Sequence, residues 1–356
     1  MSVNPGSLNN QSKIELLIDG ENLSGFEGLQ VVRAIDSAAD GYSFSLPWDP
    51  TPENIRRFQP FKVRKVFIKF DGKTIVTGYF EKLSFSTSAS GRRLNVQGRS
   101  ASGTIMDWSA GPPFQLENLS FNDVSRKLSQ AIFSDWEAGV VFVKNDTPPI
   151  GQVTIKPGET MFKVMSTLAS GHGLWARPTA EGRLEYLKFD SKRASVATLF
   201  EGISPVKTIT SDHDVTKRFQ KYMVLYTADG ETYQAEESDY QDLGLAVRGR
   251  TISELGQQTN GIYKAAEFAR SRAVINSYVA TIEVDGWHYN GTLWNPGDII
   301  TVKAPGAFIL KATRLIIVRV TYKNDESAGQ SCLLDLGIPE VYDGTAPKLE
   351  ALPWVS

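Results

Sequence analysis

Alternation of apolar and polar residues at period two, broken by turn dipeptides, is the feature that most constrains the fold of this chain. Ile14–Ile18 shows this period, and Val66–Phe70 repeats it just before Asp71-Gly72, a dipeptide that tolerates the positive φ of a tight hairpin turn. The return strand is expected from Thr74 to Ser86, and the chain then goes back through Leu94 and Val96. Three consecutive strands predict a meander, in a sheet that closes on itself as in a small barrel.

After about residue 113, the apolar residues recur at the spacing of a helix. Ser120 and Asp123 resemble a capping box at the start of a helix whose apolar stripe runs to Ile132. A second helix is expected over Met161–Leu168, with Gly171 as the left-handed residue that ends it. With a strand at Val140–Val143 and a hairpin around Glu181-Gly182, this segment reads as a small α+β unit.

The last third returns to β character at about Val206. A hairpin is predicted from Lys221 to Ala235 around Asp229-Gly230, and residues 236–258, which are polar and lack periodicity, are expected to form a loop. An alanine-rich helix should follow from Gly261 to Ile275. Strands with strong period-two character then continue to Leu336.

These patterns predict an α+β fold that is mainly β, with two small β-barrel domains flanking and joined by α+β domains. The expected divisions are a flexible N-terminus at 1–11, a first β-barrel domain at 12–112, an α+β domain at 113–202, a second β-barrel domain at 203–340 with a loop and helix excursion at about 236–275, and a C-terminal tail at 341–356.

Composition excludes some functional classes. The 356 residues include 41% hydrophobic and 22% charged residues, as in ordinary globular proteins. Lys plus Arg is 38 and Asp plus Glu is 40, which gives a formal charge of −2. A protein that grips nucleic acid usually has a positive field, because much of its affinity comes from counterion release at phosphates. This charge therefore disfavours a nucleic-acid clamp.

The sequence lacks a cysteine pair, a signal peptide and a membrane-spanning segment. Cys332 is the single cysteine, so no intramolecular disulfide and no cysteine-based metal site can form, and its apolar strand-like surroundings indicate a buried, inert thiol. Residues 1–10 lack the basic and apolar regions of a signal peptide. No apolar run approaches the roughly 20 residues that span a bilayer, so no membrane insertion is expected.

Catalytic and cofactor motifs are missing. His172, His213 and His288 lie far apart and show no metal-ligand spacing, and no nucleophile-elbow pattern accompanies them. Gly171-His172-Gly173 begins a formal match to a dinucleotide fingerprint, but a helix precedes it and a strand follows, which inverts the context that phosphate binding needs. We therefore predict no catalytic residue, no cofactor or metal site, and no cofactor.

Two carboxylates and a group of arginines are the remaining candidates for chemistry. Glu81 and Asp285 lie near turns or strand ends, where a glycan hydrolase could use a pair of carboxylates, although a role in turns or on a solvated face is the simpler interpretation. Arg92, Arg93 and Arg99 form the densest basic spot. Arginines on one hairpin more often form salt bridges with neighbouring residues than contacts with nucleic acid.

The most distinctive segment runs from Ile282 to Asp298 and contains Asp-Gly-Trp, a turn at Asn290-Gly291, Leu-Trp and Pro-Gly. It resembles a stretch in the baseplate hub proteins of contractile-tailed phages, a family that includes the phage Mu tail protein, late control protein D and the T-even hub. The turn and the two tryptophans, which could pack as a cross-strand or diagonal pair, suit this interpretation. Val96–Asp107, where a strand ends in Gly-Arg before an acidic residue, and Thr160–Phe189 resemble the same family in the same order.

The resemblance implies a virion structural protein without catalysis. Family members form a homotrimeric ring with two barrel domains in each subunit, which joins the tail tube to the central membrane-piercing spike and contacts other baseplate proteins. DNA would pass through the ring without specific binding, which agrees with the charge of −2. Assembly would take place in the bacterial host cytoplasm.

Two other functions remain open at this stage. A tail-associated cell-wall hydrolase with a hub-like fold would use acidic residues near turns, such as Glu81 and Asp285. A type VI secretion spike base would need a long β-helical region, for which the sequence has no room.

Overall fold

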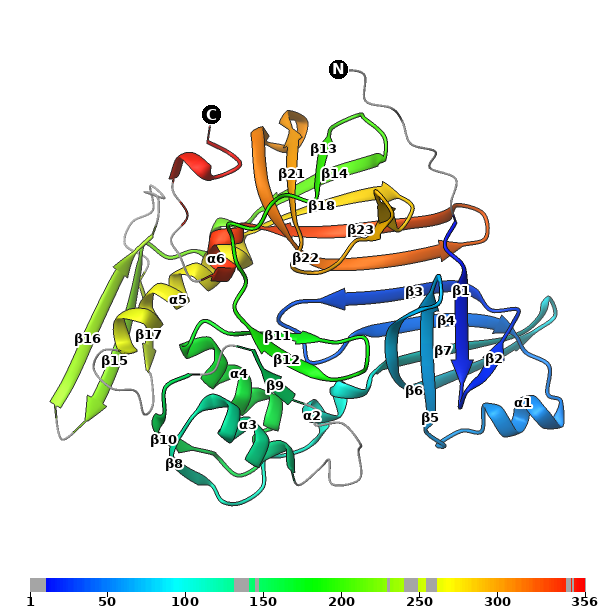
Figure 1. The fold of residues 1–356 in the computed structure, drawn as a ribbon, viewed down its shortest axis with the longest axis horizontal. Coiled ribbons are helices and arrows are strands. Elements are labelled where there is room, and N and C mark those ends of the chain that lie inside the picture. Colours follow the sequence, from blue (N-terminus) through cyan, green and yellow to red (C-terminus); the bar gives the residue numbers. More distant parts are fainter. Residues whose placement is uncertain are drawn as a thin grey trace.

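The computed structural model describes residues 11–130, 141–144, 147–228, 231–239, 249–253, 261–343, 347 and 349–355. These parts are mainly β, as the sequence predicts (Figure 1). None of their helices combines the length and the apolarity needed to cross a membrane. Residues 1–10, predicted to be flexible, and the predicted turn at Asp229-Gly230 lie outside the described residues.

Strands from both ends of the chain join one 13-stranded sheet. Its main path runs, in order, through β14 (Val206–His213), β18 (Tyr278–Asp285), β23 (Gly329–Gly337), β22 (Ile309–Asp325), β3 (Glu27–Ala34), β4 (Gly41–Pro47), β7 (Gly91–Ser100), β6 (Lys73–Ser88), β5 (Arg64–Phe70), β1 (Ile14–Ile18) and β2 (Glu21–Leu23). Beside this path, β13 (Ala197–Phe200) pairs with β21 (Ile299–Ala304), which pairs with β22.

The antiparallel pair β3–β22 joins the two regions that the sequence predicts as separate barrels. It runs from Leu29 opposite Asn324 to Ala34 opposite Arg319. Among the described residues, the strand pairs follow an open path and close neither region into a barrel. Closure requires the edge strands of one region to pair with each other, whereas here an edge strand of each region pairs with the other region.

The predicted meander near the N-terminus is confirmed. Strands β5, β6 and β7 are consecutive neighbours, and Asp71 and Gly72 form the first turn with φ of 50° and 79°. In Figure 1 the steep strands β1 and β5 contrast with the nearly horizontal β3, β4 and β7, so the strand direction changes strongly across this region. A single hydrophobic core, which includes Phe70, Phe80, Trp287 and Tyr322, serves both β-rich regions.

The middle segment has its own core, built on helices α3 (Phe121–Gln130) and α4 (Met161–Gly171). The capping prediction is confirmed, since Ser120 Oγ accepts the Asp123 amide at 3.2 Å. The prediction for Gly171 is wrong: Gly171 is still helical, and Gly173 is left-handed, with φ of 66°. The helix extends further because the Leu174 amide closes the last turn on Ala169 O at 2.9 Å.

Short strands complete this segment. They are β8 (Gln115–Leu119) paired with β10 (Ile150–Thr154), and β9 (Val141–Val143), β12 (Leu184–Leu187) and β11 (Trp175–Pro178) in a second small sheet. The predicted strand near Val143 and the hairpin around Gly182 are confirmed, whereas the pair β8–β10 was not predicted. Ile132, predicted at the end of the first helix, lies outside the described residues.

The excursion after residue 220 is more regular than predicted. Strands β15 (Lys221–Ala228), β16 (Glu231–Ser238) and β17 (Gly249–Ser253) form a sheet beside α5 (Gly261–Ser277). The prediction of a loop over 236–258 is therefore wrong for β17, which pairs with β15 in parallel. With Ile252 as its single aliphatic residue, Gly249–Ser253 shows no alternation of apolar and polar residues, and this strand forms through its backbone pairing. Residues 240–248 and 254–258 of that segment lie outside the described residues.

Candidate functional site

One face of the main sheet packs on the shared core, and the opposite face is polar and continuous across both β-rich regions. Strand register fixes its composition, because residues paired across neighbouring strands point to the same side. One row of register partners crosses seven strands: Asp285, Ser331, Lys323, Gln30, Ser43, Gln97 and Lys82. We call this surface the polar face.

Three arginines and one lysine on or near this face are neutralised by carboxylates, whereas no ion pair engages Lys82 or Lys323 in the described part of the chain. The ion pairs, with nitrogen to oxygen distances, are Arg319–Asp335 at 3.3 Å, Lys207–Asp285 at 2.8 Å, Arg93–Glu27 at 2.9 Å and Arg99–Glu81 at 2.7 Å. A phosphate that approached these cations would have to compete with a carboxylate already in contact. The polar face therefore offers hydrogen-bonding groups with little net attraction for phosphates.

A groove of about 470 Å³ lies on this face over β3, β4, β7 and β6. Its polar wall includes Gln30, Ser43, Gln97, Glu81 and Arg99. Arg99 also binds Asp107 at 2.7 Å, so one guanidinium joins β7 to Glu81 on β6 and to the end of α2 (Thr104–Asp107). Hydrogen bonds to Glu81 are the largest of the influences that raise the pKa of Arg99. These two ion pairs fix the position of the Arg99 side chain in the groove wall.

The sequence-based interpretation of the basic spot is confirmed for two of its three arginines. Arg93 and Arg99 form ion pairs with residues of neighbouring strands, and Arg92 is exposed. The candidate carboxylates Glu81 and Asp285 are each engaged by a cation, on β6 and at the end of β18 respectively.

A buried polar cluster lies where β3 meets the second β-rich region. Arg33 donates from Nε to Asp40 Oδ2 at 3.2 Å and from Nη1 to Asn295 Oδ1 at 3.0 Å. Asp40 is 1% exposed, and its Oδ1 has no hydrogen-bond partner in the described part of the chain. Burial raises the pKa of Asp40 to about 6, against the opposing effect of Arg33. The cluster ties Asn295, from the segment that resembles hub proteins, to the first β-rich region.

That segment forms a small hairpin, β19 (His288–Tyr289) and β20 (Thr292–Leu293), and the predicted turn is confirmed by φ of 49° at Asn290 and 77° at Gly291. The backbones of the two tryptophans also pair, since the Trp294 amide donates to Trp287 O at 3.2 Å.

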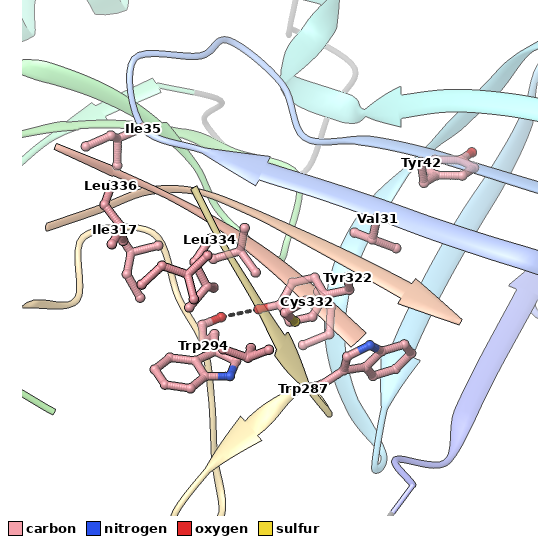
Figure 2. Close-up of a cluster of buried hydrophobic side chains, with 14 of the residues drawn as sticks. Val31, Ile35, Tyr42, Trp287, Trp294, Ile317, Tyr322, Cys332, Leu334 and Leu336 are labelled. Carbon is pink, nitrogen blue, oxygen red and sulfur yellow. Dashed lines mark hydrogen bonds between the residues drawn. The ribbon is translucent and has the colours of Figure 1, made fainter. Parts of the chain in front are cut away.

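The two tryptophan rings go to different partners, which corrects the expected ring pair. Trp287 packs on Phe70 with ring centroids 4.2 Å apart, whereas Trp294 packs on Tyr289 at 5.4 Å. Figure 2 shows the rings apart, with the Tyr322 hydroxyl donating to the Trp294 carbonyl between them. Each tryptophan thus anchors the hairpin to the shared core.

His288 lies between a serine and a carboxylate that are distant from it in the chain and that no sequence motif connects with it. Ser12 Oγ is 3.2 Å from its Nδ1, and Asp71 Oδ2 is 3.6 Å from its Nε2. The set has the residue types of a hydrolytic triad, but the carboxylate is beyond hydrogen-bond distance, Asp71 already accepts the Lys13 amide at 2.8 Å, and Ser12 is only 7% exposed. The geometry fits a structural role, in which these contacts hold the start of β1 against the β5–β6 turn and the β19–β20 hairpin.

The other candidate residues are engaged in structure. His213 packs on Tyr278 at 5.1 Å and Trp354 at 5.3 Å, and burial lowers its pKa. His172 caps the end of α4. Cys332 is fully buried in β23, and burial raises the pKa of its thiol, so the prediction of an inert thiol agrees with its surroundings. Within the described ranges, no group of three or more His, Cys, Asp or Glu side chains could hold a metal ion.

Comparison with known proteins relates this fold to phage tails. Residues 13–100 match the family model of the Mu phage baseplate assembly protein GpP-like, N-terminal. No curated protein sequence matches the chain.

Several solved structures share the fold over nearly the whole chain. The tail protein from Neisseria meningitidis MC58 is 20% identical with a TM-score of 0.81, and the match covers 95% of this chain and 100% of that protein. The prophage MuSo2 43 kDa tail protein from Shewanella oneidensis is 20% identical with a TM-score of 0.79, covering 93% and 100%. An E. coli component of the type VI secretion system, described as structurally similar to T4 bacteriophage tail proteins, is 14% identical with a TM-score of 0.58, covering 94% and 80%.

These matches confirm the resemblance that the sequence indicates. The family model accounts for β1 to β7, and the structural matches extend through the middle segment and the second β-rich region. The chain therefore has the fold of phage and prophage tail proteins, and its residues 13–100 match the family model of the Mu phage baseplate assembly protein GpP-like, N-terminal.

Proposed function

We propose that the chain is a structural hub protein of a phage or prophage tail baseplate and that it has no catalytic activity. Three copies form a ring that connects the tail tube to the central spike of a contractile tail, and the protein resides in the virion after assembly in the host cytoplasm. The observation that carries this proposal is the fold match over 95% of the chain to a tail protein, at a TM-score of 0.81.

The polar face supports a role in lining a passage for DNA. Its cations at Arg319, Arg99 and Lys207 are already bound by carboxylates, so DNA could slide past without being held. The sheet also carries this face across both β-rich regions without a break, because β3 and β22 pair directly. Each region would act as one barrel-like domain of the ring, with boundaries near 12–112 and 203–340, and the middle segment at 113–202 would face other baseplate proteins.

Light scattering together with electron microscopy of the purified chain tests this proposal. The expected result is a trimer seen as a ring with threefold symmetry that binds a trimeric spike protein. A monomer at tens of micromolar that does not bind the spike would overturn the proposal. Filter binding with duplex DNA at low salt is expected to show only weak association.

The hydrolase alternative is disfavoured, because Glu81 and Asp285 are both ion-paired, Ser12 is only 7% exposed, and Asp71 Oδ2 lies 3.6 Å from His288 Nε2. A peptidoglycan zymogram is expected to show no clearing. Clearing that disappears in Asp285→Asn, Glu81→Gln or His288→Asn would contradict the structural role.

A further inference from the structure

The polar-face sheet ends in two strands whose outer edges form no strand pair in the described part of the chain. At one end, β6 pairs with β5 only up to Phe80, so the segment from Lys82 to Ser88 pairs with β7 alone. At the other end, β14 pairs only with β18. Unpaired edges of this kind attract other strands, and folded proteins cover them or use them in assembly.

Exposed apolar side chains gather beside each of these edges. Near β6 they lie around α1 (Pro52–Arg57) and the β6–β7 hairpin: Ile55, Phe61, Val63 and Phe85. Near β14 they lie at the end of β13 and on the loops that follow β13 and β21: Phe200, Ile203 and Phe308. Trp48 packs on Phe85 of the first group and on Phe58, which is buried at the end of α1. The second group is held together by Gly306, whose amide donates to Glu201 Oε2 at 2.9 Å.

Each group includes a phenylalanine held in a strained backbone conformation. Phe61 has φ of 63° and is fully exposed, and Phe308 has φ of 57° and is 57% exposed. Bulky residues rarely adopt the left-handed region, and a strained residue that presents an aromatic ring to solvent points to a contact outside the chain. Exposed apolar residues that cluster beside a free strand edge indicate an interaction site.

In the part of the chain that the structure describes, charges without an internal ion pair are mainly positive at the first end and mainly negative at the second, where Lys303 beside Glu201 is the exception. Among the described residues, no ion pair engages the cations beside β6, which are Arg56, Lys62, Lys82 and Arg92, or the carboxylates beside β14, which are Glu201, Asp212 and Glu283. We call the first group with its apolar neighbours the basic end and the second the acidic end. Complementary charge selects partners and orients them as they meet.

We infer that the basic end of one copy docks on the acidic end of the next copy. The two surfaces differ, so the contact is heterologous and must run head to tail around a closed ring. This inference rests on the proposed trimer and adds its interface: the apolar groups bury one another, the unpaired charges meet, and the free edges of β6 and β14 face each other across the contact. The polar face would then continue from copy to copy.

Charge reversal at the two ends tests this contact by light scattering. The double variants Lys62→Glu with Arg92→Glu, and Glu201→Lys with Asp212→Lys, are each expected to weaken assembly by at least about 100-fold. Combining all four changes in one chain should restore the trimer, because the reversed ends again have opposite charge. Lys127→Glu and Glu326→Lys, which change exposed residues away from both ends, serve as matched controls and should assemble normally.

Light scattering of a mixture of the two double variants gives a second test of the contact. In the mixture each variant can dock on the other, through either an intact contact or one with both ends reversed. A closed ring of three must still place two copies of one variant side by side with like charges facing, so the mixture should form closed trimers less readily than the wild type. Phe61→Ser and Phe308→Ser should also weaken assembly, and far-UV circular dichroism checks that every variant is folded. The head-to-tail contact is wrong if the wild type and both double variants all form trimers. It is also wrong if the combined variant is folded but does not recover trimer formation. In either case the proposed function stands. A wild type that never trimerises contradicts the proposed function itself.

Discussion

Asp40 and Arg33 form a buried ion pair, Nε to Oδ2 3.2 Å, at the join between the two β-rich regions of the chain. Arg33 lies on β3, the strand that pairs with β22, and its guanidinium also donates to Asn295 in the segment that resembles hub proteins. One charged pair thus connects three stretches of sequence that the pattern analysis treated separately. Substitutions of Arg33 and of Asp40 can each test how this pair contributes to the free energy of unfolding.

Replacing Arg33 with methionine should destabilise the protein strongly. Asp40 would keep its buried position without the guanidinium that offsets its charge, and breaking a buried pair in this way costs about 3–5 kcal/mol. Urea unfolding at pH 7 measures the free energy of unfolding. Lys127→Met, at an exposed position on α3, is the control and should stay within about 0.5 kcal/mol of the wild type. A loss for Arg33→Met no larger than that of the control would contradict this account.

The pH dependence of stability should include a contribution from Asp40. Burial raises the pKa of Asp40 from 3.8 to about 6 in the folded state, so at intermediate pH the folded protein holds a proton that the unfolded chain has released. The free energy of unfolding therefore falls as pH rises from about 4 to about 6, by about 3 kcal/mol in total. Asp40→Asn removes this titration.

Unfolding curves at several pH values isolate the effect as the difference between wild type and Asp40→Asn. Other carboxylates titrate in both proteins and cancel in that difference. The variant should gain on the wild type as pH rises through this range. Parallel pH profiles for the two proteins would refute the raised pKa.

Local structure was predictable where a short stretch of sequence carries its own physical reason. Asp71-Gly72 and Asn290-Gly291 form turns because these residue pairs tolerate positive φ, and Ser120 caps a helix because its hydroxyl satisfies a free amide. The strand β17 was missed because five residues, Gly249–Ser253, carry no period of their own.

Relationships between distant segments were not predictable from the same patterns. Nothing in the period-two alternation of β3 or β22 specifies that these two strands pair with each other, because any edge strand offers the same backbone groups. For the same reason His288 could not be connected with Ser12 and Asp71, which lie more than 200 residues away in the sequence. The interface residues Phe61 and Phe308 also gave no signal, since exposure and a left-handed φ are properties of the folded chain.

Because the two β-rich regions share one core, a destabilising substitution in one region should also destabilise the other. Phe70 on β5 packs on Trp287 at 4.2 Å and on Tyr322 of β22 at 5.4 Å. Phe70→Ala should cost about 3–5 kcal/mol and should speed hydrogen exchange in β22 and β23 as much as in β5 and β6. Phe121→Ala, in the separate core of the middle segment, is the matched control and should act mainly on α3 and α4. Exchange that changes only in the first region after Phe70→Ala would mean that the regions unfold independently.

The close approach of β7 to its neighbours depends on Gly98. A Cβ at this position would lie 2.2 Å from Tyr79 O and 2.3 Å from the Tyr42 hydroxyl, so the sheet or the tyrosine would have to move. Gly98→Ala should therefore lower the free energy of unfolding by about 1–3 kcal/mol or more. Gly41→Ala, on the neighbouring strand β4, is the matched control, because a Cβ there meets nothing within 4 Å. Because the added Cβ would meet the buried Tyr42 ring, Gly98→Ala should also change the environment of that ring in near-UV circular dichroism. Equal stabilities for the two alanine variants would show that the strands can separate without cost.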